Sequence, residues 1–233
     1  MRHIHVKLIP SERDLYDIPR DIVLLIDILR ATSTLAAMFA NGIKKVYPFS
    51  DLDILEKTYL EDRECYKAGE INGLRIKGFH FGNSPYEFCN LKYTKILFYT
   101  TNGTKLIRHI PCESKHIFAL SFLNTKATVE KIEEIKGNIL ILCASDEGQV
   151  SIADTLCAGY FISFLENSKL SDSAKICFDF YRHQKNIEKT ILDSYHAQKL
   201  LKYDFGREDI LFCAQKDIYN FAIKYKKGYF FKL

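Results

Sequence analysis

Three apolar segments of this chain each end abruptly in small, polar or glycine residues. They cover residues 22–34, 95–104 and 138–148. An apolar run that is rich in branched side chains is typical of a strand buried on both faces of a parallel sheet. In open α/β sheets, ligands bind beyond the carboxyl ends of such strands, where helix N-termini also present unpaired N–H groups. We therefore expect the polar residues that follow these three strands to meet in one pocket.

Strands and helices alternate along most of the chain. The other predicted strands cover residues 2–9, 44–49, 115–121 and 228–232. Helical patterns cover residues 32–41, 51–61, 124–136 and 150–166. This alternation predicts an α/β fold, with three α/β/α layers around a largely parallel or mixed sheet. The pattern from about residue 172 to residue 225 is mostly helical, and these helices are predicted to pack on that sheet. Residues 1–233 are therefore predicted to form a single α/β domain or, alternatively, two closely packed lobes of which the helical part is the second.

The composition disfavours nucleic-acid-binding and membrane proteins. The net charge is only +4, with 33 basic and 29 acidic residues, so binding to nucleic acid has no support. No apolar stretch reaches the roughly 18 residues that a membrane span requires. The seven cysteines are scattered and never spaced Cys-x-x-Cys, which is typical of reduced thiols in a cytoplasmic protein. The oligomeric state is open, with a homodimer the commonest outcome for a soluble oligomer.

Asp27 and Arg30 follow the first of the three apolar runs. A buried carboxylate is costly unless it is paired or binds a metal, so Asp27 needs a partner. In a pocket at the strand end, Asp27 is suited to bind a cation and Arg30 an anion. The alternative is structural, either an ion pair between the two side chains or a cap for the helix that starts near Thr32.

The turn from Thr100 to Thr104 has two interpretations. Asn102-Gly103 between apolar runs is typical of a type I′ hairpin. A glycine turn flanked by hydroxyl groups is equally suited to form a nest of backbone N–H groups that binds phosphate. The sequence leaves both interpretations open.

Two further carboxylates are candidates at the same strand ends. Asp154 follows Ser151 in a capping box that opens a helix, so capping is its default role, although it lies within reach of the pocket. Glu70 belongs to the glycine-rich segment 68–85, which is predicted to have little regular structure. Such a loop is usually a surface connection, but a long ordered one can form an active-site wall. In that case Glu70 is a candidate metal ligand or base.

The absence of several known motifs disfavours a zinc site and the common nucleotide-binding loops. No cluster of Cys and His residues has the spacing of a zinc site, and the chain has neither a G-x-G-x-x-G dinucleotide loop nor a P-loop. Of the seven histidines, His80 in the glycine-rich segment is the one candidate for catalysis. The others are interpreted as structural or surface groups.

Several short motifs together resemble the magnesium-dependent 2-phosphosulfolactate phosphatases of coenzyme M biosynthesis. They are Asp27-Ile-Leu-Arg30-Ala-Thr-Ser-Thr34, Ala68-Gly69-Glu70-x-Asn72-Gly73, Gly82-Asn83-Ser84-Pro85, Thr100-Thr101-Asn102-Gly103-Thr104, Ser121-Phe-Leu-Asn124 and Asp154-x-x-Cys157-Ala-Gly159. A weaker match runs through Asp209, Cys213 and Asp217. The order and approximate spacing of these motifs cover most of the chain.

The resemblance implies Mg²⁺-dependent hydrolysis of a small 2-hydroxy-acid phosphate monoester, 2-phosphosulfolactate. It implies catalytic roles for Asp27, Arg30, Glu70 and Asp154, with the three carboxylates as metal ligands. The residues implied to bind substrate or phosphate are Arg30, Thr32, Asn83, Ser84, Thr100, Thr101, Asn102, Gly103 and Thr104. Either water or Asp27 itself attacks phosphorus, and Asp154 or Glu70 is suited to orient the water.

The chain departs from the family pattern at two places. An acidic residue commonly precedes the aspartate of the last helix motif, where this chain has Ala153, and the loop with Asp146 and Glu147 is more acidic than usual. Two other functions therefore stay open. One is a phosphatase for another 2-phospho-hydroxycarboxylate, and the other is a non-catalytic binding protein for an anionic metabolite.

Overall fold

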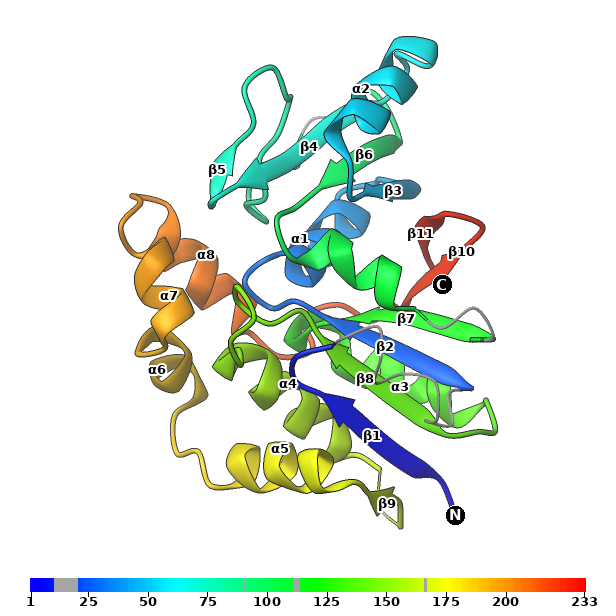
Figure 1. Ribbon diagram of the computed structural model, residues 1–233, viewed down its shortest axis with the longest axis vertical. Coiled ribbons are helices and arrows are strands. Elements are labelled where there is room, and N and C mark those ends of the chain that lie inside the picture. Colours follow the sequence, from blue (N-terminus) through cyan, green and yellow to red (C-terminus); the bar gives the residue numbers. More distant parts are fainter. Residues whose placement is uncertain (11–20, 90, 111–113, 166) are drawn as a thin grey trace.

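The computed structural model describes residues 1–10, 21–89, 91–110, 114–165 and 167–233. Within them, eleven strands form one mixed sheet (Figure 1). The strands are β1 His3–Lys7, β2 Ile22–Ile26, β3 Lys45–Phe49, β4 Tyr66–Ile71, β5 Leu74–Arg75, β6 Lys95–Tyr99, β7 His116–Leu120, β8 Ile139–Cys143, β9 Lys169–Leu170, β10 Ile223–Lys226 and β11 Tyr229–Lys232. Their order across the sheet is β5-β4-β6-β3-β11-β10-β7-β2-β8-β1-β9. The α/β fold expected from the alternating pattern is confirmed.

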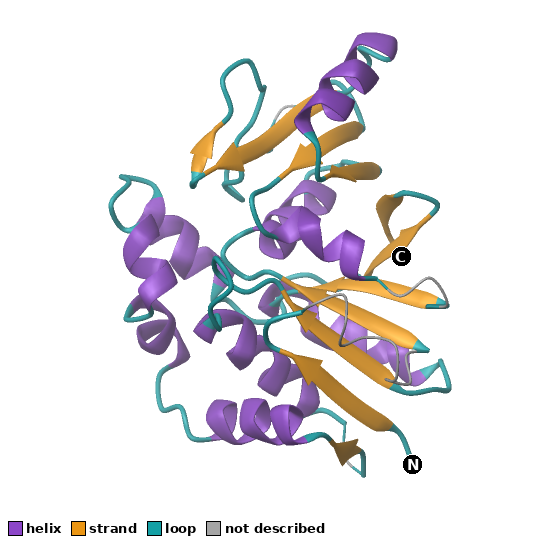
Figure 2. Ribbon diagram, in the orientation of Figure 1, coloured by secondary structure: helices purple, strands orange, loops and turns teal. Residues whose placement is uncertain are grey.

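Helices pack on both faces of the central strands (Figure 2). They are α1 Ala31–Ala40, α2 Leu52–Glu61, α3 Thr125–Glu133, α4 Ile152–Ile162, α5 Asp172–Arg182, α6 Ile187–Leu192, α7 Tyr195–Leu200 and α8 Gly206–Cys213, with short 3-10 helices η2 Gly103–His109 and η3 Phe122–Asn124. The predicted helix over residues 150–166 ends at Ile162, and residue 166 lies outside the described residues. None of the described helices combines the length and the hydrophobicity needed to cross a membrane.

Strand β2 lies at the centre of the core and is buried along its whole length. Successive side chains of a strand point to opposite faces, so β2 contributes to two separate apolar clusters. Leu24 and its β2 neighbours on that face pack with residues of α4, α5 and the C-terminal helices, whereas Val23 and Leu25 pack with α1. The helical C-terminal part therefore packs on the sheet as predicted.

A C-terminal hairpin joins two blocks of parallel strands. Strands β4, β6 and β3 form one block, and β7, β2, β8, β1 and β9 form the other. Between them, β10 and β11 pair antiparallel with each other, with β7 and with β3. The prediction of a helical pattern up to residue 225 is wrong at β10. A four-residue strand is too short for its own pattern to identify it, and only its pairing with β7 and β11 makes it one.

The segment 68–85 is more regular than predicted. Strand β4 pairs parallel with β6, and β5 folds back on β4. The prediction of little regular structure is therefore wrong for the first part of this segment. Gly69 weakens the strand signal, but close packing requires it, because a Cβ atom at this position would lie 2.2 Å from the carbonyl oxygen of Tyr99 on β6.

Candidate active site

A cavity of about 240 Å³ lies where several strands of the sheet end. Its walls come from the loops after β2, β6 and β8, from the β4–β5 turn, from the loop that contains Asn83, and from α7 with the residues that follow it. The lining residues are Asp27, Leu29, Arg30, Glu70, Asn72, Gly73, Asn83, Thr100, Thr101, Asn102, Asp146, Glu147, His196, Lys199, Leu200, Lys202 and Tyr203. Polar residues that follow three separate strands thus meet in one cavity, as the pattern of strand ends predicts.

The structure brings together only part of the predicted site. The predicted residues that line the cavity are Asp27, Arg30, Glu70, Asn83, Thr100, Thr101 and Asn102. Those that lie outside its lining are Thr32, Ser84, Gly103, Thr104 and Asp154. Their roles in binding or catalysis stay predictions.

Asp27 follows β2 directly and has only 6% of its surface exposed. Its Oδ1 atom accepts a hydrogen bond of 3.2 Å from the N–H group of Ala31, at the start of α1. Burial raises the pKa of the Asp27 carboxyl from 3.8 to about 7, and the charges of Glu70 and Asp146 add to the shift, while the Ala31 bond and Arg30 oppose it. The negative charge of Asp27 is therefore poorly compensated, which suits a side chain that binds a cation.

The glycine turn packs directly against Asp27. A Cβ atom at position 103 would lie 2.5 Å from Asp27 Oδ2, so only glycine permits this close approach. The turn leads into the 3-10 helix η2, and the hairpin interpretation is wrong. The N–H group of Thr104 donates to Thr100 Oγ1 at 3.1 Å, and Thr104 Oγ1 donates to the carbonyl oxygen of Thr100 at 2.8 Å. These two hydroxyl groups therefore close the turn.

Asp154 supports the site from outside the cavity lining. Its Oδ1 atom accepts a hydrogen bond of 2.8 Å from the N–H group of Ile28, in the loop after β2. Its own N–H group donates to Ser151 Oγ at 3.3 Å, so Ser151 caps α4 as predicted, whereas the Asp154 carboxylate, the other half of the predicted capping box, binds Ile28. Burial raises the pKa of Asp154 well above its ordinary value, and the charge of Asp27 raises it further. Asp154 thus anchors the loop that carries Asp27 and Arg30.

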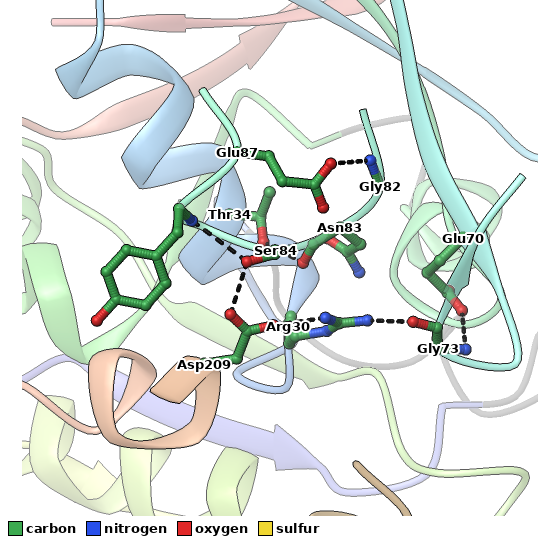
Figure 3. A network of polar contacts seen from close by, with 10 residues as sticks. Arg30, Thr34, Glu70, Gly73, Gly82, Asn83, Ser84, Glu87 and Asp209 are labelled. Carbon is green, nitrogen blue, oxygen red and sulfur yellow. Dashed lines mark hydrogen bonds and ion pairs between the residues drawn. The ribbon is translucent and has the colours of Figure 1, made fainter. Parts of the chain in front are cut away.

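Arg30 is fixed by contacts from two distant segments, the β4–β5 turn and α8 with its N-cap residue; Figure 3 shows its contacts with Gly73 and Asp209. Its Nη1 atom lies 2.5 Å from Asp209 Oδ2 on α8, and its Nη2 atom donates to the carbonyl oxygen of Gly73 at 2.7 Å. The guanidinium also lies 5.0 Å from the centre of the Phe205 ring. The suggested ion pair between Asp27 and Arg30 is wrong, because Arg30 pairs with Asp209. The other oxygen of Asp209 accepts a bond of 2.6 Å from Ser84 Oγ.

Glu70 joins the β4–β5 turn to the glycine turn. Its Oε1 atom accepts from the N–H group of Thr101 at 2.7 Å, and its Oε2 atom accepts from the N–H group of Gly73 at 2.7 Å. The position of Glu70 at the end of β4 directs the buried carboxylate to the cavity. The Thr101 hydroxyl donates a second bond to Oε2, of 3.2 Å, so Oε1 is the oxygen that can still accept a further donor or bind a cation.

Asn83 lies in a loop that is held on both sides. The hydroxyl of Thr34 donates to the carbonyl oxygen of Asn83 at 2.9 Å, and the N–H group of Gly82 donates to Glu87 at 2.6 Å. Figure 3 shows the amide nitrogen of Asn83 turned toward the guanidinium side of the network. The Oδ1 atom is buried and has no hydrogen-bond partner among the described residues. The amide N–H groups and Arg30 are thus suited to bind one anion together.

Sequence reasoning missed the wall that α7 provides. His196 and Lys199 line the cavity, although the histidine was interpreted as structural or exposed and the lysine was not singled out. Burial lowers the pKa of His196. No motif marks these residues, because α7 has only six residues and its position over the strand ends depends on the tertiary fold. His80, the predicted catalytic histidine, instead accepts a bond of 3.0 Å from the N–H group of Lys67 and is not part of the cavity lining.

The donor set of the cavity fits a hard divalent cation. Asp27, Glu70 and Asp146 all contribute carboxylates to its lining. No group of three or more His, Cys, Asp and Glu side chains among the described residues is already arranged to hold a metal ion. Mg²⁺ does not require one, since it keeps several waters and usually binds one or two carboxylates together with substrate phosphate. The poorly compensated charge of Asp27 makes it the first candidate ligand.

The family model and the similar proteins all carry the same family name. A family model described as 2-phosphosulpholactate phosphatase matches residues 7–228. A protein of Pseudothermotoga lettingae named "Probable 2-phosphosulfolactate phosphatase" is 34% identical, over 91% of this chain and 92% of its own length. Proteins with the same name from Thermotoga maritima and Clostridium acetobutylicum are 36% and 30% identical, over 84% and 96% of this chain and 85% and 98% of their own lengths.

Proposed function

This chain belongs to the 2-phosphosulpholactate phosphatase family, a family of phosphoric monoester hydrolases, and from that membership we propose that it hydrolyses 2-phosphosulfolactate to sulfolactate and phosphate with Mg²⁺ as cofactor. The observation that carries the proposal is the coincidence of the family match over residues 7–228 with a cavity in which Asp27, Arg30 and Glu70 meet.

The proposed roles follow from the contacts of each side chain. Arg30, held by Asp209 and the carbonyl oxygen of Gly73, and the amide of Asn83 bind the phosphoryl oxygens. Asp27 would hold Mg²⁺, with Glu70, which also lines the cavity, as the second carboxylate. When bound, Mg²⁺ would offset negative charge on the phosphoryl group.

We propose direct attack by water on phosphorus. A bond from the water oxygen to phosphorus forms while the bond from phosphorus to the ester oxygen breaks. The water loses a proton and the leaving alkoxide gains one, so sulfolactate leaves as the alcohol. Glu70 is better placed than Asp154 to orient the water, because Glu70 lines the cavity.

A substrate panel tests the proposed function. Purified protein is expected to release phosphate from 2-phosphosulfolactate, and removal of divalent ions with EDTA should abolish the release until Mg²⁺ is restored. Phosphate release is measured for 2-phosphosulfolactate and for other 2-phospho-hydroxycarboxylates, with and without Mg²⁺. Activity confined to the other esters would overturn the proposed substrate. Ligand-induced stabilisation without any phosphate release would identify a binding protein.

The pKa of Asp27 predicts how Mg²⁺ binding depends on pH. The carboxyl must be ionised to bind the cation, and its pKa is raised to about 7, so protons compete with Mg²⁺ below that pH. The apparent Kd for Mg²⁺ should therefore fall as the pH rises from about 5.5 and level off above about 7.5, with up to about a tenfold change per pH unit on the acid side. Isothermal titration calorimetry measures this dependence directly, and a flat profile would remove Asp27 from the metal site.

We also propose that the protein works in the cytoplasm. Six cysteines are free thiols in the described part of the chain, and all but Cys89 are buried. Free buried thiols fit a reducing compartment.

A further inference from the structure

The acidic loop after β8 forms part of the cavity wall, and the proposed chemistry gives no role to either of its carboxylates, Asp146 and Glu147. Asp146 and Gln149 exchange two backbone hydrogen bonds of 2.9 and 2.8 Å, which close a tight turn. Glu147 within this turn and Ser145 directly before it have φ angles of 51° and 61°, a left-handed conformation that residues other than glycine rarely adopt. This turn directs both acidic side chains toward α7.

Lys199 on α7 is the common partner of these two acids. Its Nζ atom lies 3.0 Å from Asp146 Oδ2 and 2.9 Å from Glu147 Oε2. The side chain of Asp146 is 8% exposed and that of Glu147 is 69% exposed, so the ammonium lies at the boundary between the buried site and solvent. An ammonium group has three N–H donors, and the two carboxylates use two of them. Lys199 also lines the cavity, where the third donor can serve a ligand.

One face of α7 presents cationic and polar groups together. His196 lies three residues before Lys199, so the two side chains share a face of the helix, and both line the cavity. The Nδ1 atom of His196 is buried without a hydrogen-bond partner among the residues that the structure describes. The α7 wall thus has polar atoms that the proposed chemistry does not use, namely Nζ of Lys199 and Nδ1 of His196. The Arg30 guanidinium, in contrast, is already fixed by Asp209 and Gly73.

The charge of the substrate requires such a second cationic position. The proposed substrate carries a carboxylate and a sulfonate in addition to its phosphate. The charged side chains of the lining are four carboxylates against three cations, namely Asp27, Glu70, Asp146 and Glu147 against Arg30, Lys199 and Lys202. Arg30 and a metal at Asp27 serve the phosphate, so the remaining anionic groups need a cation elsewhere in the cavity.

We propose that Lys199 is a specificity-determining residue whose ammonium group binds an anionic group of the substrate other than its phosphate. Asp146 and Glu147 fix the ammonium for this contact, which gives the unusually acidic loop a function. The inference rests on the proposed function, because it takes its substrate from there. The contacted group is the carboxylate or the sulfonate, and both are oxyanions that accept a charge-assisted hydrogen bond.

Kinetics of Lys199→Met on four phosphate monoesters test this inference. The esters are 2-phosphosulfolactate, 2-phospholactate without the sulfonate, the phosphate of 2-hydroxypropane-1-sulfonate without the carboxylate, and p-nitrophenyl phosphate with neither group. The variant should raise KM for 2-phosphosulfolactate by about tenfold or more and change kcat by less than about threefold. The ester that lacks the contacted group, and p-nitrophenyl phosphate, should be unaffected, which identifies that group. Lys199→Arg keeps the charge and should recover most of the affinity.

Lys189→Met on α6 is the matched control, because Lys189 is an exposed lysine paired only with Asp193 in the described structure and lies outside the cavity lining. An equal loss on all four esters, or no change in any KM, would overturn the inference and leave Lys199 as a structural link. Calorimetry of sulfolactate binding distinguishes a failure of this inference from a failure of the proposed function. Sulfolactate binding that weakens about tenfold in Lys199→Met, in a protein that hydrolyses none of the esters, would overturn the activity and keep the binding role.

Discussion

Replacement of Asp27 by asparagine is expected to lower kcat by about 10³-fold or more while the protein keeps its fold. Asparagine has nearly the same shape but no charge, so it cannot hold Mg²⁺ as a carboxylate does. The substitution leaves the Oδ1 acceptor for the N–H group of Ala31 in place. Steady-state phosphate release in saturating Mg²⁺ measures the effect.

Although Asp27→Asn should lose activity, it should gain stability at high pH. The folded-state pKa of Asp27 is raised, so the contribution of its protonated form to stability is complete below about pH 3.8 and is lost as the pH rises through about 7. Asparagine resembles the protonated acid. Without divalent ions at pH 8, Asp27→Asn should therefore be more stable than the parent, by up to a few kcal/mol. Thermal unfolding at pH 4 and pH 8 measures the difference.

Asp53→Asn is a suitable control, because Asp53 is an exposed aspartate in the first turn of α2 and lies outside the cavity lining. It should leave activity and its pH dependence unchanged. Turnover like that of the parent in Asp27→Asn would exclude Asp27 from the reaction, whether as metal ligand or as nucleophile.

Replacement of Arg30 by lysine is expected to lower kcat/KM by about 10²-fold and to destabilise the fold by about 1–3 kcal/mol. Lysine keeps the charge but replaces the planar fork by a single nitrogen, which cannot occupy the positions of both Nη1, bonded to Asp209, and Nη2, bonded to the carbonyl oxygen of Gly73. Either Asp209 or the Gly73 carbonyl oxygen then loses its partner in a buried site. Steady-state kinetics and urea unfolding measure the two effects.

A second variant separates positioning from direct binding. Asp209→Asn leaves Arg30 intact but removes the charge that fixes it, so KM should rise while the charge that binds phosphate remains. Arg182→Lys on α5 is the control, since Arg182 lies in the last turn of that helix and outside the cavity lining. A parent-like KM in both Arg30→Lys and Asp209→Asn would contradict the proposed phosphate contact.

Several parts of the site could be predicted because their signals are local. The buried run of β2 and the charged residues after it lie within a few positions of one another, and so do the partners of the Ser151 cap. The Thr100–Thr104 turn is equally local, but its sequence left two interpretations open and did not predict the 3-10 helix into which it leads. Backbone propensity and short-range hydrogen bonds decide such features, and both can be recognised in a single sequence. Strands β4 and β10 were not predicted in this way, because glycine and lysine interrupt their apolar pattern and only pairing with neighbouring strands identifies them.

By itself, the sequence determined the α/β alternation, the polar residues at the strand ends and the family to which the chain belongs. Only the tertiary structure decided the partners: Arg30 pairs with Asp209, which is 179 positions away, and Lys199 pairs with the acidic loop 52 and 53 positions before it. It also decided which carboxylates face the cavity, since Glu70 lines it and Asp154 lies behind it. The physical reason is that contacts between distant segments follow from strand order and helix packing, whereas the periodicity of a segment reports only which of its own faces is buried.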